Sequence, residues 1–423
     1  MSGPIPRTAR DDTPRMTTTP PRVGIMLRHV TAPGGVTVFT KRVVRWLLSH
    51  PRGVDYHLLY SDPSQREVFA DLPGTHVVLQ DSARIRWDQV TAPRYAERNG
   101  LSLLFNCKFS VPLAARVPTL IVIPGREQLA MAHVFPWYNR WYNQLLVPAF
   151  CRSASALITH TEIGREDCVM MGARPESITV IPHGVDRYLR PATEEAKAAL
   201  KARLGLTRPY VLFLGGITPL KNIGNLLRGF ARLSRSHDLD LVLAGFKRWS
   251  FERELAPIAE LGLEDRVKYV GYVPDEDLAA LYSAAECLAL PSWYEGFGIP
   301  IVEAMSCGCP VVTSSGRHAA PEVAGGAAVL VDPADPGAIA TGLSQVLDDP
   351  RLRAELIQKG LVRGPQFDWD VTGRRTAEVI ESLVARPAPR EGALAGVKRA
   401  MVRGVASATA VVTERVAGGF YKK

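Results

Sequence analysis

The sequence lacks any long hydrophobic run. No stretch of its 423 residues approaches the about 20 consecutive apolar residues that a transmembrane helix needs, and no signal-peptide core follows the N-terminus. The six cysteines are scattered without a CxxC pair, which argues against a disulfide framework and favours a reduced, cytoplasmic chain. Cys307 and Cys309 are better explained as buried thiols than as half of a metal site.

Familiar nucleotide and nucleic-acid motifs are also missing. The GxGxxG spacing of a dinucleotide fingerprint is absent and no basic stripe dominates, so nucleic acid is not expected as a partner. The net charge of +9 and the pI of about 9.3 still predict attraction to an anion. A nucleotide sugar, a lipid phosphate and a membrane surface all satisfy that prediction.

The length and the pattern of elements predict two domains. Hydrophobic residues make up 46% and charged residues 22% of the chain, a soluble globular balance, and 423 residues exceed one ordinary core. Alternating strand and helix patterns start at residue 22 and restart at residue 210. We expect a disordered arm over residues 1–21, a first domain over 22–186, a second over 187–365, a segment 366–385 that crosses back to the first, and a basic tail over 386–423.

Two carboxylates stand out in the second half. Glu295 follows an apolar run over residues 287–290 and lies in a loop with glycines at 296 and 298, while Pro300 suits the start of a helix that would hold Glu303 in its first turn. Both carboxylates would then lie at the carboxyl edge of a parallel sheet, where such folds bind ligands. They could accept hydrogen bonds from sugar hydroxyls while loop amides favour a diphosphate. Alternatively, Glu295 caps the helix and Glu303 is a solvated charge.

Two glycine pairs follow predicted strands. Gly34-Gly35 separates the strand over residues 22–26 from an amphipathic helix, and Gly215-Gly216 begins a turn over residues 215–220, after which Lys221 opens a helix. A lysine at a helix start opposes the helix dipole, and a bound diphosphate would reverse that cost. The alternatives are a tight turn at the first pair and a solvent-exposed lysine at the second.

The DxD of Asp238 and Asp240 directly precedes a predicted strand. It would lie at the end of the sheet away from the expected site, so we interpret it as a solvated strand start and predict no metal. Residues 246–248, which follow the same strand, are better placed to contact a ligand at the carboxyl edge of the sheet.

The aromatic run over 135–142 could be an acceptor platform, a membrane-facing surface or a packed helix face. The basic tail could be a flexible extension, which we favour, or a helix lying on the inner membrane face.

Residues 295–312 read EGFGIPIVEAMSCGCPVV, and residues 321–328 read PEVAGGAA. This pattern resembles the donor-binding signature of retaining glycosyltransferase family 4. The resemblance implies an α/β fold of GT-B type, with two Rossmann-like domains whose parallel sheets face a central cleft. It also implies transfer of a sugar from a nucleotide diphosphate donor to a hydroxyl of a glycan, lipid-linked or small-molecule acceptor. The anomeric configuration would be retained, without metal or cofactor.

By the same resemblance, Glu295 and Lys221 are the catalytic candidates, at the reacting sugar and the diphosphate, and Glu303 holds the donor ribose. The donor-binding set is Gly215, Gly216, Lys221, Tyr272, Val273, Glu295, Gly296, Phe297, Gly298, Ile299 and Glu303. The loops that face the reacting sugar and the acceptor supply Gly34, Gly35, Arg126, Glu127 and His133.

The chain departs from the family pattern at two positions. Pro124 stands where many members have a histidine, so that role passes to Arg126, Glu127 or His133, or is not needed. Gly216 stands where members often have an arginine, which leaves the diphosphate to Lys221 and backbone amides. These departures favour one alternative, a catalytically silent GT-B relative that binds or scaffolds. A GT-B nucleotide-sugar epimerase is the other, and the EGFGIP block argues against it.

Overall fold

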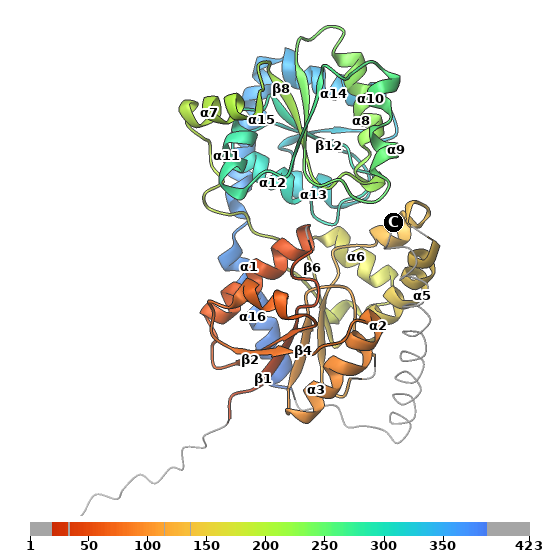
Figure 1. The fold of residues 1–423 in the computed structure, drawn as a ribbon, viewed down its shortest axis with the longest axis vertical. Coiled ribbons are helices and arrows are strands. Elements are labelled where there is room, and N and C mark those ends of the chain that lie inside the picture. The colour runs from red at the N-terminus through yellow and green to blue at the C-terminus, as the bar shows by residue number, and fades with distance from the viewer. Residues whose placement is uncertain (1–18, 33, 114, 136, 387–423) are drawn as a thin grey trace, which may run out of the picture.

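The computed structural model describes residues 19–32, 34–113, 115–135 and 137–386. Within them the chain forms two α/β domains, one above the other in Figure 1. Apart from residues 19–21 and 386, the expected N-terminal arm and basic tail lie outside the described residues. None of the described helices is long and apolar enough to span a bilayer.

The first domain contains a seven-stranded parallel sheet in the order β3-β2-β1-β4-β5-β6-β7. Its strands are β1 (Arg22–Met26), β2 (Asp55–Tyr60), β3 (Thr75–Val78), β4 (Leu103–Asn106), β5 (Thr119–Val122), β6 (Ala156–Thr159) and β7 (Ile178–Val180). The central strands are short apolar runs buried on both faces, which is typical of parallel sheets covered by helices. The strand order reverses direction between β1 and β4, which opens a crevice at their carboxyl ends.

The second domain repeats this plan with a six-stranded parallel sheet in the order β10-β9-β8-β11-β12-β13. Its strands are β8 (Tyr210–Leu214), β9 (Asp240–Ala244), β10 (Val267–Gly271), β11 (Cys287–Leu290), β12 (Val311–Ser314) and β13 (Ala328–Val331). The order reverses between β8 and β11. The two parallel sheets confirm the expected fold class of two Rossmann-like domains.

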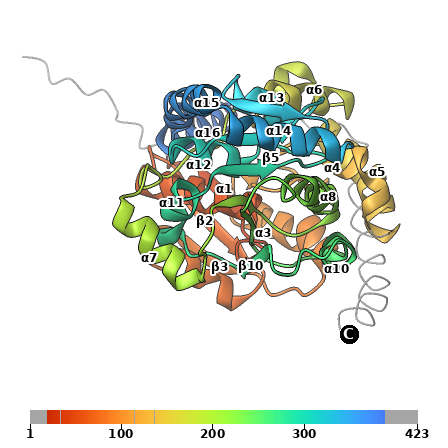
Figure 2. The same ribbon diagram turned by 90° about the horizontal axis from the view of Figure 1, so that it is seen from above.

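Helices flank both sheets (Figures 1 and 2). In the first half they are α1 (Gly35–Ser49), α2 (Arg84–Arg86), α3 (Ala92–Arg98), α4 (Glu127–Ala130), α5 (Trp137–Ser153) and α6 (Glu162–Met170). In the second half they are α7 (Glu194–Leu204), α8 (Ile223–Leu233), α9 (Phe251–Leu255), α10 (Pro257–Glu260), α11 (Asp275–Ser283), α12 (Ile299–Ser306), α13 (Ala319–Ala324), α14 (Pro336–Asp348), α15 (Pro350–Arg363) and α16 (Trp369–Val384). Short helical turns are η1 (Pro63–Phe69), η2 (Trp87–Thr91), η3 (Ala132–Val134), η4 (Pro175–Ser177), η5 (Pro219–Lys221) and η6 (Gly364–Gln366).

Helix α16 returns from the second domain and packs against α1 of the first (Figure 1). Ile380 and Leu383 join the apolar core of the first domain. Where the chain crosses back, the amide of Val185 donates to the carbonyl oxygen of Phe367 over 2.9 Å. The outgoing and returning segments are therefore hydrogen-bonded to each other between the domains.

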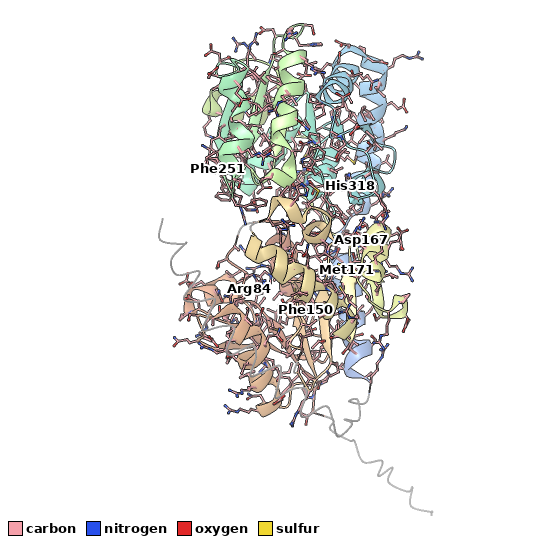
Figure 3. All side chains as sticks on the ribbon, turned by 90° about the vertical axis from the view of Figure 1, so that its right-hand side faces the viewer. Arg84, Phe150, Asp167, Met171, Phe251 and His318 are labelled. Atoms are coloured by element: carbon pink, nitrogen blue, oxygen red, sulfur yellow. The ribbon has the colours of Figure 1, made fainter. Side chains whose placement is uncertain are left out.

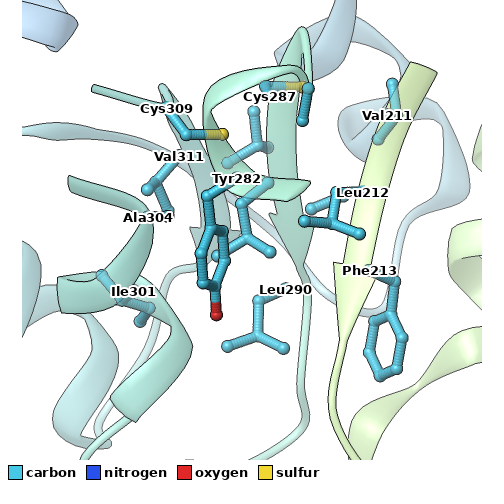
Figure 4. Close-up of a cluster of buried hydrophobic side chains, with 14 of the residues drawn as sticks. Val211, Leu212, Phe213, Tyr282, Cys287, Leu290, Ile301, Ala304, Cys309 and Val311 are labelled. Carbon is cyan, nitrogen blue, oxygen red and sulfur yellow. The ribbon is translucent and has the colours of Figure 1, made fainter. Parts of the chain in front are cut away.

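Tyr282 connects the apolar core of the second domain to Glu303. Figure 4 shows this ring among the apolar side chains that include Leu290, Ile301 and Ala304. Its hydroxyl donates to Oε2 of Glu303 over 2.8 Å. All six cysteines are buried and unpaired.

Candidate functional site

Loops at the carboxyl ends of the two sheets meet between the domains. A Cβ atom on Gly296, in the loop after β11, would lie 2.7 Å from Cβ of Pro124, after β5. Only glycine permits that approach. Gly35, at the start of α1, also faces the second domain, since a Cβ there would lie 3.4 Å from Cδ1 of Ile299. The structure thus brings the Gly34-Gly35 loop, the Pro124 loop and the loop over residues 295–299 together.

Asp167 on α6 joins the two domains. Its side chain is fully buried and accepts hydrogen bonds from the Tyr294 hydroxyl and, over 2.8 Å, from Nη1 of Arg317, both in the second domain. In the first domain, Nε of Arg126 lies 3.1 Å from Oδ1 of Asp167. Burial raises the pKa of the Tyr294 hydroxyl, with Glu127 and Asp167 adding to the shift, so this hydroxyl stays a donor. Figure 3 shows Asp167 near the boundary between the domains.

A second contact between the domains also involves α6. The carboxylate of Glu322 on α13 accepts from the first two amides of α6, at Glu162 over 2.8 Å and at Ile163 over 3.0 Å. A carboxylate at a helix N-terminus satisfies otherwise unbonded amides and stabilises the positive end of the helix dipole. Neither Asp167 nor Glu322 carries a sequence signal for this role, because their partners are distant along the chain.

The two catalytic candidates contact each other. Lys221 ends the turn η5, and its Nζ atom lies 2.6 Å from Oε1 of Glu295, which also accepts from the Ser292 hydroxyl over 2.6 Å. Glu295 is 6% exposed. The alternative of a solvent-exposed lysine is therefore wrong. The expectation that Lys221 opens a helix needs correction, since α8 begins two residues later, at Ile223.

Glu295 does not cap the following helix. The cap of α12 is Gly298, with a φ of 93° and no side-chain hydrogen bond, so the capping alternative is wrong. Phe297 is buried, and its ring centroid lies 4.8 Å from that of His183 in the first half of the chain. The loop is therefore fixed by contacts at both Gly296 and Phe297.

The sequence predicted Glu303 in the first turn of its helix. Glu303 is the fifth residue of α12 and therefore lies in the second turn. The alternative of a solvated charge is also wrong, because the carboxyl is partly buried and accepts from Tyr282. Burial raises the pKa of Glu303 to about 7, and the hydrogen bond from Tyr282 opposes that shift. The Oε2 atom of Glu303 is thus fixed by the hydroxyl of Tyr282, a residue of the apolar core.

An exposed aromatic pair follows two neighbouring strands of the second sheet. Tyr272, after β10, is 57% exposed, and its ring stacks on Phe246, after β9, with centroids 5.0 Å apart. Val273 is buried beneath this edge. The pair offers a flat apolar surface beside the Gly215-Gly216 turn. That turn follows β8, which lies between β9 and β11 in the sheet.

Comparisons with known proteins agree with this architecture. Residues 33–188 match the family described as Glycosyltransferase Family 4, and residues 196–363 match Glycosyl transferases group 1. The MMP alpha-(1->4)-mannosyltransferase of Mycolicibacterium hassiacum is 33% identical over 298 residues, 68% of this chain and 70% of that protein. The chain belongs to glycosyltransferase family 4.

Another family-4 relative is the O-antigen chain mannosyltransferase B of Escherichia coli, 35% identical over 236 residues. That match spans 55% of this chain and 61% of the relative, less than two thirds of its length. Among solved structures, Anabaena Alr3699/HepE in complex with UDP and glucose superposes with a TM-score of 0.69. It is 20% identical and covers 85% of this chain and 99% of that one, which shows the shared GT-B fold.

Glu127 is one of the three residues expected to take the role of the histidine that the resemblance places at Pro124. Glu127 opens α4, and its Oε2 atom is buried without a hydrogen bond within the described residues. Burial, followed by the neighbouring carboxylates of Asp167 and Glu295, raises the pKa of Glu127 to about 7. Arg126 is engaged with Asp167, and His133 is exposed in η3. The charges of Glu295 and Lys221 thus both act on the Glu127 carboxyl.

Gly216 stands where the resemblance leads us to expect an arginine, and the side chain of Arg248 lies beside it. The loops after β8 and β9 are hydrogen-bonded, with the Arg248 amide donating to the Ile217 carbonyl oxygen over 3.1 Å. A Cβ atom on Gly216 would lie 3.2 Å from Cγ of Arg248, and one on Gly215 would lie 3.9 Å from Cε of Lys221. Two cationic side chains therefore border the Gly215-Gly216 turn, and the lack of a side chain at 216 leaves room for one of them.

The DxD lies at the amino end of β9, which is the opposite end of the strand from this site. Asp238 is exposed, as expected, and pairs with Arg266. Asp240 corrects the expectation of a solvated strand start, since it is buried and its Oδ1 accepts from Nη1 of Arg208 over 3.2 Å. Across the described residues, no group of three His, Cys, Asp or Glu side chains is arranged to hold a metal ion.

Proposed function

We propose that this chain is a retaining glycosyltransferase that moves a sugar from a nucleotide diphosphate donor to an acceptor hydroxyl without a metal ion. The observation that carries the proposal is the Lys221–Glu295 pair beside the Gly215-Gly216 turn, at the carboxyl edge of the second sheet. A cation, loop amides and a buried carboxylate at one point suit a diphosphate that is bonded to a sugar. The solved complexes of Anabaena Alr3699/HepE with UDP and with UDP-glucose support a donor of this class.

The diphosphate would lie along the glycine turn, between Lys221 and Arg248. Amides of residues 296–298 and the N-terminus of α12 add positive potential on the other side. Positive potential at this point stabilises the charge that collects on the phosphate oxygen as the bond to the sugar breaks. In this site that stabilisation replaces the metal ion used by other transferases.

The nucleoside would extend toward β10. Glu303 keeps one oxygen on Tyr282 and offers the other to the ribose hydroxyls. The exposed rings of Tyr272 and Phe246 give the base an apolar surface, and backbone groups at Val273 would contact its edge. This arrangement places the reacting sugar between Glu295 and the loops of the first domain.

In the chemical step, the bond from the anomeric carbon to the donor phosphate breaks and its electron pair stays on the phosphate oxygen. The acceptor hydroxyl attacks the same face of the sugar, and its proton passes to the departing phosphate, so the configuration is retained. Glu295 borders the positive charge on the sugar ring. Glu127, across the cleft, would hold a sugar hydroxyl with Oε2, the carboxyl oxygen that lacks a hydrogen bond within the described residues.

A panel of nucleotides and nucleotide sugars tests this proposal. The matching nucleotide should raise the temperature of thermal unfolding, and its sugar should be released or transferred. Nucleotide binding without release or transfer from any donor would favour the silent binding relative. Conversion of the nucleotide sugar into an epimer would favour the epimerase.

A further inference from the structure

Three basic side chains of the first domain converge at the switch point of its sheet. β1 and β4 are neighbours, with Met26 paired to Asn106, and Arg28 and Lys108 each lie two residues further on. Both backbones are fixed: the Arg28 carbonyl oxygen accepts from Nε2 of Gln65 over 2.8 Å, and the Lys108 amide donates to Oδ1 of Asn106 over 3.1 Å. Equal register at neighbouring strand ends places the two residues side by side at the mouth of the crevice.

Arg84 completes the group from the start of α2. Figure 3 shows it in the part of the first domain that is turned toward the second. One helical turn later, the buried carboxylate of Asp88 accepts from the Ser110 hydroxyl over 3.0 Å, and that hydroxyl also accepts from Nδ2 of Asn106 over 2.8 Å. This hydrogen-bonded chain connects α2 and η2 to the loop that carries Lys108.

The charges around Lys108 are predominantly positive. Burial lowers the pKa of Lys108 to about 8, and Arg84, Arg28 and Arg248 add to the lowering, whereas the carboxylate of Asp88 opposes it. The same cations act on His29, whose pKa is lowered to about 3 by burial and then by Lys108, Arg84 and Arg28. The buried carboxylate of Asp88 lies among the same cations and offsets part of their charge. Together the three basic residues still give this end of the sheet a positive potential that attracts an anion.

We propose that Arg28, Arg84 and Lys108 bind a phosphate ester group of the acceptor. This inference rests on the proposed function, because it assigns the acceptor side of the same cleft. Two guanidinium groups and one ammonium suit a tetrahedral dianion, which accepts several charge-assisted hydrogen bonds. The acceptor is therefore a phosphorylated sugar or polyol, or a lipid with a phosphate headgroup.

The cluster belongs to a different sheet from the donor diphosphate, and Arg248 at the Gly215-Gly216 turn is near enough to act on the charge of Lys108. Lys221 and the Gly215-Gly216 turn belong to the second sheet, whereas the cluster lies at the ends of β1 and β4 of the first. The chain runs from Arg28 into the Gly34-Gly35 loop, and Gly35 contacts Ile299 of the donor-side loop. An acceptor held by its phosphate at Lys108 would thus present a hydroxyl toward the sugar between Gly35 and Glu295.

The first experiment measures binding without turnover. Inorganic phosphate and a set of sugar phosphates should raise the unfolding temperature of the wild type and of Lys41→Ala, an exposed basic control on α1, but not of Lys108→Ala or Arg84→Gln. Lys108→Arg should restore the effect. Equal protection of all variants by phosphate would overturn the inference even if no donor is ever found. Circular dichroism of each variant establishes that it is folded.

The second experiment uses the reaction. Phosphorylated acceptors should be used in preference to their dephosphorylated counterparts, and Lys108→Ala should raise their KM roughly tenfold while nucleotide affinity stays within about twofold. An equal loss of nucleotide affinity would assign the cluster to the donor and overturn the inference. Co-sedimentation with vesicles of phosphatidic acid, compared with phosphatidylcholine, distinguishes the two sources: binding that depends on Lys108 indicates a lipid phosphate, and no binding indicates a soluble one.

Discussion

The Nζ atom of Lys221 lies 2.6 Å from Oε1 of Glu295, although the two residues are 74 positions apart in the chain. This ion pair joins the turn after β8 to the loop after β11, the two strands between which the second sheet reverses order. A diphosphate bound at the turn would share the ammonium with the carboxylate. The two groups are thus positioned together, one for the leaving phosphate and one for the sugar.

Replacing Lys221 by Ala should lower kcat by about 100-fold or more, because the leaving phosphate loses its ammonium partner. The fold should suffer less, since Glu295 keeps its hydrogen bond from Ser292. Steady-state kinetics and thermal unfolding of the same preparation measure both effects. Lys221→Arg, which keeps the charge, should recover part of the rate. An unchanged kcat in Lys221→Ala would remove this residue from the site.

Replacing Glu303 by Ala should weaken nucleotide binding by about ten- to a hundredfold, the usual range for losing hydrogen bonds to a charged group. Because its pKa is raised to about 7, the wild-type affinity should increase as the pH rises through 7 and the carboxyl becomes a double acceptor. Calorimetric titration between pH 6 and 8 gives this profile. Tyr282→Phe removes only the hydroxyl and should shift the profile without abolishing binding. A flat profile in the wild type would contradict the ribose role.

Glu127 should affect stability as well as activity. Its pKa in the folded chain is about 7, above the ordinary 4.5, so the folded state keeps a proton that the unfolded state has lost. The free energy of unfolding should therefore fall as the pH rises from about 4.5 to about 7, and this part of the slope should disappear in Glu127→Gln. Urea unfolding at several pH values measures it. Glu176→Gln, at an exposed site, should keep the wild-type slope, and a Glu127→Gln variant that does the same would refute the assignment.

Asp167 should hold the two domains together. Replacing it by Ala leaves Arg126 and Arg317 without their buried partner, a change that typically costs about 3 kcal/mol or more. Its neighbour Glu166 pairs with Nη2 of the same Arg317 at the surface, so Glu166→Ala should cost less than about 1 kcal/mol. Small-angle scattering should show a larger radius of gyration for Asp167→Ala alone. Identical unfolding and scattering for both variants would exclude a role between the domains.

The fold and the donor loop could be predicted from the sequence because their signals are local. Short apolar runs alternate with amphipathic segments, and Glu295 and Glu303 lie within one short loop and the helix that follows it. Asp167 carried no such signal, since Tyr294 and Arg317 reach it only after both domains have folded and met. The burial of Asp240 was missed for a similar reason, because its partner Arg208 precedes a different strand.

Arg248 should supply the cation that is absent at position 216. Arg248→Ala is expected to weaken binding of the nucleotide diphosphate by about tenfold, the effect of one charge-assisted hydrogen bond. Gly216→Arg alone should also impair binding, because its side chain would meet Cγ of Arg248, which lies 3.2 Å from the Cβ position.

The double variant Gly216→Arg/Arg248→Ala tests whether Arg248 supplies the cation that is absent at position 216. It returns one guanidinium to the turn and removes the obstacle, so its nucleotide affinity should exceed that of either single variant. Arg253→Ala on α9 serves as the matched control and should bind as the wild type does. If the two single losses simply add in the double variant, an arginine at position 216 does not take the place of Arg248 on the diphosphate, and the expected compensation is wrong.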